Sequence, residues 1–186
     1  SRLHMPGHKG TGPLGCERWD ITEIMGADSL YEASGIIAQS EKNAAALFSS
    51  RCTLYSAGGS SQCIKAMLYL ALQRGHSRTI LSARNVHKAF VHAAALLDFE
   101  VQWLWPEPYE LLRCCVTEEM VEQALRQADP LPAAVYVTSP DYLGNVQPIE
   151  KLAHVCHRYG VPLIVDNAHG AYLHFLSTPA HPLDLG

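Results

Sequence analysis

The stretch VPLIVDNAHG, at residues 161–170, decides the fold. Its first half is apolar almost without a break, and Pro162 lies near its start, where a strand tolerates proline. Continuous apolar character without alternation is typical of a parallel strand that is buried on both faces. The run ends at Asp166, and open α/β sheets bind their ligands at the carboxyl ends of such strands. A turn cap is the alternative role for this carboxylate.

The remainder of the chain repeats the same unit, in which a short apolar strand is followed by a helix. Strands are predicted at residues 52–56, 78–82, 99–103, 133–137 and 161–165. Helices are predicted at residues 36–50, 62–73, 117–127 and 149–159, with an alanine-rich helix after Lys88 that ends near Leu97. Because strands and helices alternate, we predict an α/β fold with three α/β/α layers and a mostly parallel sheet.

The first 35 residues form a different segment, rich in glycine and proline and with little periodicity. Irregular segments of this length are uncommon unless they are functional or disordered, so we expect an arm that packs on a neighbour or covers a site. Its large apolar side chains are therefore expected to be buried: Trp19, Ile21, Ile24, Met25 and Leu30. The predicted division is an N-terminal arm at 1–35 and a large domain at 36–186.

Composition and charge narrow the class of protein. With 186 residues, of which 48% are hydrophobic, the chain can bury the core of one domain or of a large piece of one. A net charge of -4 disfavours a nucleic-acid partner, and no apolar run approaches the roughly 20 residues that span a bilayer. The six cysteines form no CxxC pair, so we expect reduced thiols in a cytoplasmic protein, and the histidines complete no metal site.

A glycine turn, AGGSS at residues 57–61, joins the first predicted strand to a helix. Gly59 lets the backbone approach a ligand, and Ser60 and Ser61 offer hydroxyl groups beside the free N–H groups of a helix start. This combination suits a phosphate group, although such a turn also caps helices that bind nothing. The nucleotide-binding pattern GxxxxGK[ST] is absent from the sequence, and the one GxGxxG match, GTGPLG at residues 10–15, lies in the irregular first segment rather than between a strand and a helix.

Other strand ends carry polar residues too. His87 opens the helix after the second strand, as a ring that could stack on an aromatic cofactor or as a polar helix-start residue. Thr138 follows the fourth strand, and Asp166, Ala168 and His169 follow the fifth. A carboxylate that faces a pyridine nitrogen keeps that nitrogen protonated, which is the arrangement expected for pyridoxal 5'-phosphate (PLP).

Six motifs, in the same order along the chain, resemble those of the ornithine/lysine/arginine decarboxylases, which are PLP-dependent enzymes of the aspartate aminotransferase fold. The motifs are HMPGHKG, WDITEIMGADSL, AGGSS, RNVHKA, TSPDYLG and IVDNAHGAY. The resemblance implies that Ser60 and Ser61 bind the cofactor phosphate, that His87 stacks on the ring and that Asp166 pairs with the pyridine nitrogen.

The same resemblance extends to the rest of the site and to the assembly. It implies that Ala168 lies against the ring face and that His169 stands close to the cofactor, so His87, Asp166 and His169 are the expected catalytic residues. The HMPGHKG arm is expected to contribute to the active site or to the interface of a homodimer or a larger homo-oligomer.

The expected reaction is decarboxylation of a basic amino acid (lysine, arginine or ornithine) to a polyamine-type amine. A different PLP reaction on the same scaffold, such as transamination or aldol cleavage, is one alternative. A non-catalytic PLP-binding module, or a subunit that pairs with a complete enzyme, is the other.

One feature of the family has no counterpart in the sequence. The resemblance implies a lysine that forms the Schiff base with PLP, a few tens of residues after the aspartate strand. None of the five lysines follows Asp166: Lys9, Lys42, Lys65, Lys88 and Lys151. We therefore expect the front of a catalytic domain, incomplete at its C-terminus and inactive alone. The strand at 52–56 would then lack its partner strand, so the piece is expected to be weakly stable or to self-associate.

Overall fold

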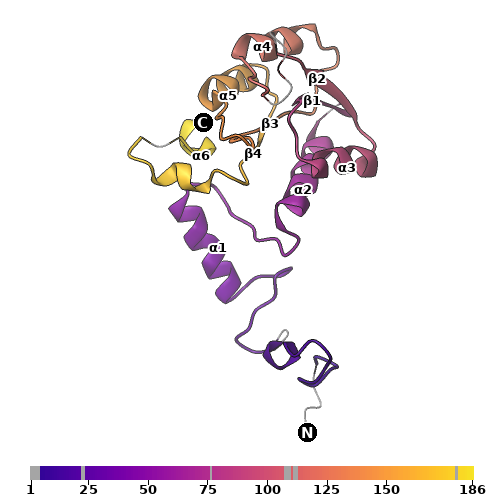
Figure 1. The fold of residues 1–186 in the computed structure, drawn as a ribbon, viewed down its shortest axis with the longest axis vertical. Helices are drawn as coiled ribbons and strands as arrows, with labels where there is room; N and C mark the ends of the chain where they lie inside the picture. The colour runs from indigo at the N-terminus through magenta and orange to yellow at the C-terminus, as the bar shows by residue number, and fades with distance from the viewer. Residues whose placement is uncertain (1–4, 22–23, 76, 107–109, 111–112, 179) are drawn as a thin grey trace. The chain divides into compact units, whose positions relative to one another are not determined.

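The computed structural model describes residues 5–21, 24–75, 77–106, 110, 113–178 and 180–186. The helices are α1 (Ile36–Leu47), α2 (Gly59–Arg74), α3 (Lys88–Leu97), α4 (Glu118–Gln127), α5 (Ile149–Arg158) and α6 (Pro182–Leu185) (Figure 1). The strands are β1 (Thr79–Ala83), β2 (Glu100–Leu104), β3 (Ala134–Thr138) and β4 (Leu163–Asp166). Two short 3-10 helices lie at Glu17–Trp19 and Ala171–Phe175. The chain divides into two compact units, one that ends at Tyr55 and one that begins at Ser56. The predicted division at residue 35 stays a prediction.

The second unit contains a sheet of four parallel strands in the order β2-β1-β3-β4. β3 lies inside the sheet and all five of its residues are buried, as expected for a strand covered on both faces. Four of the five predicted strands are thus confirmed, and so is the parallel sheet.

Helices cover both faces of this sheet. On one face, α4 and α5 enclose a core that includes Val121, Leu125 and Leu152. On the other face, α2 and α3 enclose a second core that includes Leu68 and Phe90. Figure 1 shows the two helix pairs on opposite sides of the strands, and the predicted three-layer α/β/α architecture is confirmed.

Local sequence signals set the helix ends. Thr117 caps α4, because its hydroxyl accepts the backbone N–H of Met120 at 3.4 Å. α5 is followed by Gly160, whose φ of +67° suits the left-handed turn that ends many helices. α2 begins at Gly59 rather than at residue 62, because the glycine turn itself enters the helix.

On the described part of the chain, no helix has both the length and the apolar character needed to cross a bilayer.

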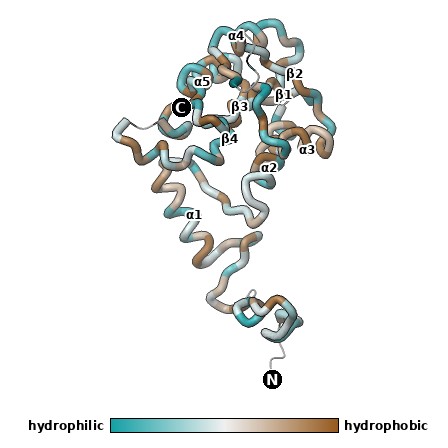
Figure 2. Tube along the Cα trace, viewed as in Figure 1, coloured by the Kyte–Doolittle hydropathy of each residue, from teal (hydrophilic) through white to brown (hydrophobic). Residues whose placement is uncertain are grey.

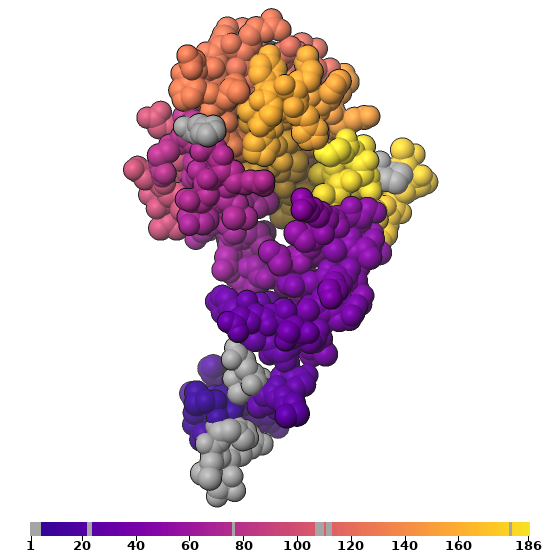
Figure 3. All heavy atoms as spheres, turned by 180° about the vertical axis from the view of Figure 1, so that it is seen from behind, coloured from indigo at the N-terminus to yellow at the C-terminus, as the bar shows by residue number. Residues whose placement is uncertain are grey.

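The C-terminal residues pack on the α5 side of the unit. α6 lies against α5, and Figure 3 shows the yellow C-terminal segment beside the orange region that contains α5. The Nδ1 atom of His174 lies 2.9 Å from both carboxylate oxygens of Asp184, a hydrogen-bonded contact that joins the 3-10 helix to α6.

The predicted strand at residues 52–56 is wrong, because these residues adopt no strand and belong to no sheet. The backbone N–H of Tyr55 donates to the Glu41 carboxylate of α1 at 2.8 Å. The hydroxyl groups of Tyr55 and Ser40 lie 2.9 Å apart. Tyr55 thus forms hydrogen bonds with α1 through both its backbone N–H and its side chain, instead of pairing with a strand.

Within this chain alone the apolar arm residues are not buried, so their expected burial against a neighbour stays a prediction. Trp19 is 71% exposed and Met25 is fully exposed, and Ile21, Ile24 and Leu30 are exposed as well. A unit of this size encloses little apolar surface, and neither its 3-10 helix nor α1 contains a buried residue. Figure 2 shows apolar residues scattered along this unit. His4, which opens the HMPGHKG motif, lies outside the described residues.

One carboxylate organises the entry into α1. Asp28 accepts the backbone N–H groups of Ser29, Ser34, Gly35 and Ile37 at 2.8 to 3.0 Å. These bonds, led by that from Ser34, hold the pKa of Asp28 well below its ordinary value. The contribution of Asp28 to stability is therefore complete above the ordinary Asp pKa of about 3.9 and is lost as the pH falls below it.

We predict that Asp28→Asn speeds amide hydrogen exchange at Gly35 and Ile37 at neutral pH, because the charged acceptor is removed. Asparagine tolerates the positive φ of residue 28, so the backbone is not strained by the change. The matched control, Glu32→Gln, removes an exposed charge from the same loop and should leave exchange unchanged. Equal exchange rates in the two variants would contradict this role of Asp28.

Candidate active site

Two buried polar side chains, Thr138 and Asp166, end β3 and β4 and are partners in the strand register. Alternation along each strand puts Thr138 on the face of Tyr136, and Asp166 on the face of Ile164. Tyr136 and Ile164 both belong to the core beneath α2 and α3. The side chains of Thr138 and Asp166, with exposed fractions of 5% and 6%, therefore lie together at the carboxyl edge of the sheet on that side.

Two donors hold the Asp166 carboxylate. The Tyr136 hydroxyl donates to Oδ2 at 3.2 Å, and the backbone N–H of Ala168 donates to Oδ1 at 3.3 Å. The bond from Ala168 is the turn-capping contact that the sequence left open as an alternative, whereas the bond from Tyr136 comes from a neighbouring strand. Burial, followed by the charge of Asp166, raises the pKa of Tyr136, so its hydroxyl keeps its proton and donates.

The segments after β3 and β4 interlock. Asn167 donates from Nδ2 to the carbonyl oxygen of Ser139 at 2.6 Å. A Cβ atom at Gly170 would come within 2.5 Å of the Pro140 ring and closer still to the Asn167 amide, so this turn requires glycine. His169 is exposed, with its ring centroid 5.4 Å from that of Tyr142.

Hydrogen bonds within the loop after β3, and from this loop to the segment before α4, hold the loop in place. Asp141 accepts the backbone N–H and the amide N–H of Asn145 at 2.9 to 3.1 Å. Burial alone would raise the pKa of Asp141, but the hydrogen bonds from Asn145 and Leu143, together with the charge of Arg113, outweigh it and lower the pKa. The backbone N–H of Gln147 donates to Ser139 Oγ, and its side chain accepts the N–H of Val116, both at 3.0 Å. These bonds hold the loop after β3 in one conformation next to the carboxyl edge of the sheet.

His87 is the N-cap of α3, which packs on the same face of the sheet as Asp166. Its Nδ1 accepts the backbone N–H of Ala89 at 3.1 Å, so in the neutral ring the hydrogen lies on Nε2. The Phe90 ring lies 4.6 Å from that of Tyr136, which ties the start of α3 to β3. The half-buried imidazole of His87 therefore caps the start of α3, and its hydrogen bond with Ala89 fixes the orientation of the ring.

The glycine turn 57–61 forms the start of α2. Gly75, which follows α2, lies against Ala133, because a Cβ atom there would be 2.7 Å from the Ala133 Cβ. Since Ala133 directly precedes β3, α2 runs antiparallel to the strands and its first turn points toward the carboxyl edge. Gly58 is the N-cap and supplies no side-chain cap, so no capping residue competes with an anion for the first N–H groups of α2, although the Gln62 side chain lies against Gly58.

Space and backbone geometry at this turn also suit a ligand. Gly59 has a φ of +64°, which glycine adopts without strain. Apart from the adjoining residues and the backbone of α2 itself, no atom of the described residues lies within 4 Å of the place that a Cβ atom on Gly59 would occupy. Ser60 is exposed and Ser61 is half-buried.

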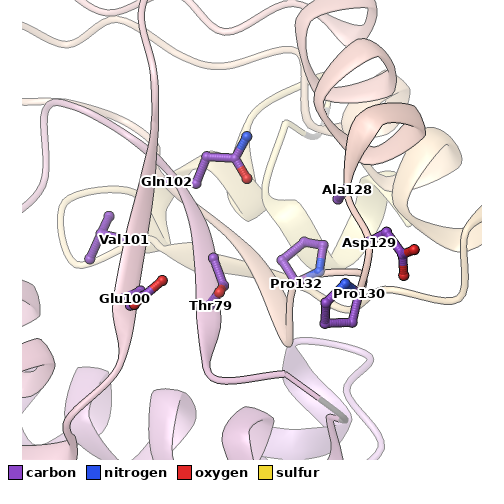
Figure 4. A pocket seen from close by; sticks show the side chains of 8 residues that line it. All are labelled: Thr79, Glu100, Val101, Gln102, Ala128, Asp129, Pro130 and Pro132. Carbon is purple, nitrogen blue, oxygen red and sulfur yellow. The ribbon is translucent and has the colours of Figure 1, made fainter.

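A pocket of about 380 Å³ lies elsewhere, at the amino edge of the sheet (Figure 4). Its walls come from the starts of β1 and β2 and from the loop before β3: Thr79, Glu100, Val101, Gln102, Ala128, Asp129, Pro130 and Pro132. None of the predicted site residues lines it, so this pocket is not the site that the sequence analysis describes.

The structure therefore connects the predicted residues to different degrees. Thr138, Asp166 and Ala168 are joined by register and by a direct hydrogen bond. His87 and the turn of Gly59, Ser60 and Ser61 are brought to the same side by α3 and α2, and His169 lies at the exposed rim. Tyr136 was missed, although a hydroxyl-bearing side chain two residues before Thr138 in an apolar strand was a usable signal.

Comparison with known proteins places this arrangement in a family. An arginine decarboxylase of Halalkalibacterium halodurans is 32% identical, over 94% of this chain and 37% of that protein. The crystal structure of mouse CSAD in apo form matches with a TM-score of 0.66 and 21% identity, over 84% of this chain and 38% of that chain. The pyridoxal-5'-phosphate dependent protein YhfS of Escherichia coli matches with a TM-score of 0.54 and 14% identity, over 70% of this chain and 33% of that chain.

The two structural matches show a shared fold, and the chain spans little more than a third of the length of the arginine decarboxylase. A family model described as "Orn/Lys/Arg decarboxylase, major domain" matches residues 16–186. That match covers most of the chain, which therefore belongs to the Orn/Lys/Arg decarboxylase family.

Proposed function

We propose that this chain forms part of a PLP-dependent decarboxylase that converts a basic amino acid to a polyamine-type amine. The observation that carries the proposal is the buried Asp166 carboxylate, held by two donors at the carboxyl edge of β4. Membership of the family and the similarity to an arginine decarboxylase support decarboxylation of a basic substrate.

The residues at this edge fit the proposed cofactor. Thr138 Oγ1 is buried and makes no hydrogen bond of ordinary geometry among the described residues, although it interacts with the Tyr136 hydroxyl, so a polar ligand group would complete its bonding. The uncapped start of α2 offers N–H groups and two serine hydroxyls to a phosphate. The similarity to the PLP-dependent protein YhfS supports the same cofactor on this fold.

Each residue has a distinct task in the proposed site. Ser60 and Ser61 would hold the phosphate, while His87 and Ala168 would contact the ring. PLP, when bound, supplies an electron sink for the electron pair that is left when carbon dioxide departs. Asp166, as a buried anion, would keep a proton on the pyridine nitrogen, and His169 at the rim would stand close to the substrate.

The proposal assigns the Schiff-base lysine to a part of the protein outside residues 1–186. Lys88 adjoins His87 but is exposed, and no lysine of the chain follows Asp166. Residues 1–186 alone would therefore be inactive. The small fraction of the arginine decarboxylase that the chain spans supports this assignment.

We also propose that the whole protein is cytoplasmic and forms a homodimer or a larger homo-oligomer. All six cysteines are free thiols, which suits a reducing compartment. The large exposed side chains of Trp19 and Met25 in the arm support its contact with another surface, since such a contact would remove their apolar area from water.

Replacement of Asp166 tests the proposed reaction. In the full-length protein, Asp166→Ala should lower the turnover number by roughly 10²- to 10³-fold, the range for loss of a preorganised electrostatic group. Release of amine and carbon dioxide measures the effect, and thermal unfolding checks that the fold persists. The control, Asp129→Ala, removes an exposed aspartate at the other edge and should keep full activity. Turnover near that of the wild type in Asp166→Ala would rule out the assignment.

A charge at the start of α2 tests the phosphate site independently of activity. Ser61→Asp should weaken PLP binding at least about tenfold, because the new carboxylate repels the phosphate. Asp in the first turn of a helix stabilises that helix, so unfolding would not explain a loss. Titration followed by PLP absorbance gives the affinity, with the exposed Ser177→Asp as the control of equal charge. Unchanged affinity in Ser61→Asp would place the phosphate elsewhere.

A further inference from the structure

We infer that Tyr136 is a positioning residue for the Asp166 carboxylate, which it orients through a buried hydrogen bond. The inference rests on the proposed function, because it concerns how Asp166 faces the pyridine nitrogen of PLP. Tyr136 does not itself need to touch the cofactor or the substrate.

The Tyr136 hydroxyl donates to only one of the two oxygens of the Asp166 carboxylate. Tyr136 is completely buried in β3, and its hydroxyl lies 3.2 Å from Oδ2 of Asp166 in the neighbouring strand. The second oxygen, Oδ1, is occupied by the N–H of Ala168. Two donors at two different oxygens fix the plane of the carboxylate as well as its position.

An aromatic cluster prevents the tyrosine from turning away. Phe90 of α3 lies against the Tyr136 ring, with centroids 4.6 Å apart. Phe90 is itself held by Phe99 and Trp103, with centroid distances of 5.7 and 5.9 Å. Since all of these rings pack in the core on the α2–α3 side, the direction of the hydroxyl is set by the core rather than by the site.

The electrostatic consequence follows from burial. Desolvation disfavours an ionised carboxylate, whereas a hydrogen bond to the charged form favours it. The Tyr136 hydroxyl remains a donor because burial and the adjacent charge oppose loss of its proton. Without this donor, the Asp166 carboxylate would keep only the bond from Ala168 and could rotate about it, so its contact with the pyridine nitrogen would weaken.

The test compares Tyr136→Phe, Asp166→Asn and the double variant in the full-length protein with PLP. Tyr136→Phe keeps the ring and removes only the hydroxyl. We expect its kcat to fall about tenfold to a hundredfold, the range for a lost hydrogen bond to a charged group, while KM stays within about twofold. The absorbance spectrum of bound PLP should also change toward that of Asp166→Asn.

Coupling separates positioning from a merely structural role. If Tyr136 acts through Asp166, its replacement should have no further effect on kcat or spectrum in the Asp166→Asn background. Tyr159→Phe removes a hydroxyl after α5, in contact with the other core, and serves as the control with wild-type behaviour. Thermal unfolding of each variant confirms a folded protein.

The outcomes distinguish this inference from the proposed function. Wild-type kcat and spectrum in Tyr136→Phe, or an undiminished effect of that change in the Asp166→Asn background, would overturn the role of Tyr136 while leaving the decarboxylase proposal intact. A wild-type protein that binds no PLP, or an Asp166→Asn variant with full activity, would instead overturn the proposed function.

Discussion

A carboxylate that is taken out of water must be compensated by nearby donors, and Asp166 imposes this constraint on the edge of the sheet. Its two donors come from different places, one from the core strand β3 and one from the turn after β4. The carboxylate can be satisfied only while β3 and β4 keep their register, because a shift of one residue would turn Tyr136 to the opposite face. The chemistry of the edge and the pairing of the strands therefore depend on each other.

The two faces of the sheet contribute differently to this edge. The α4–α5 side supports the loop after β3 through Gln147 and the backbone of Val116. The α2–α3 side supplies the helix starts, where Gly59 and His87 lie. One layer is thus a support and the other carries the polar groups that the proposed cofactor requires.

Strands that are buried on both faces of the sheet could be predicted from the sequence, because they appear as continuous apolar runs. The apolar runs that became β3 and β4 identified their strands, and the polar residues that end them, Thr138 and Asp166, identified the edge. The run at 52–56 has a similar composition but pairs with no strand, because its polar groups bind α1. Composition alone does not say which partner an apolar segment finds.

Contacts between residues far apart in the sequence were not predictable in the same way. The bond from Tyr136 to Asp166 spans 30 positions, and although the spacing of Tyr136 and Thr138 puts both on one face of a strand, it does not say which residue of another strand they meet. The loop around Asp28 was likewise not predictable, since the Asp28 carboxylate accepts backbone N–H groups up to ten residues away. Both depend on three-dimensional closeness that periodicity does not encode.

The interlocking of the two loops at the edge has a consequence for motion. Asn167 is bonded to Ser139, and Gly170 packs against Pro140, so the segments after β3 and β4 cannot separate without breaking contacts on both strands. The two segments therefore form one connected unit, and a displacement of either one would be passed to the other.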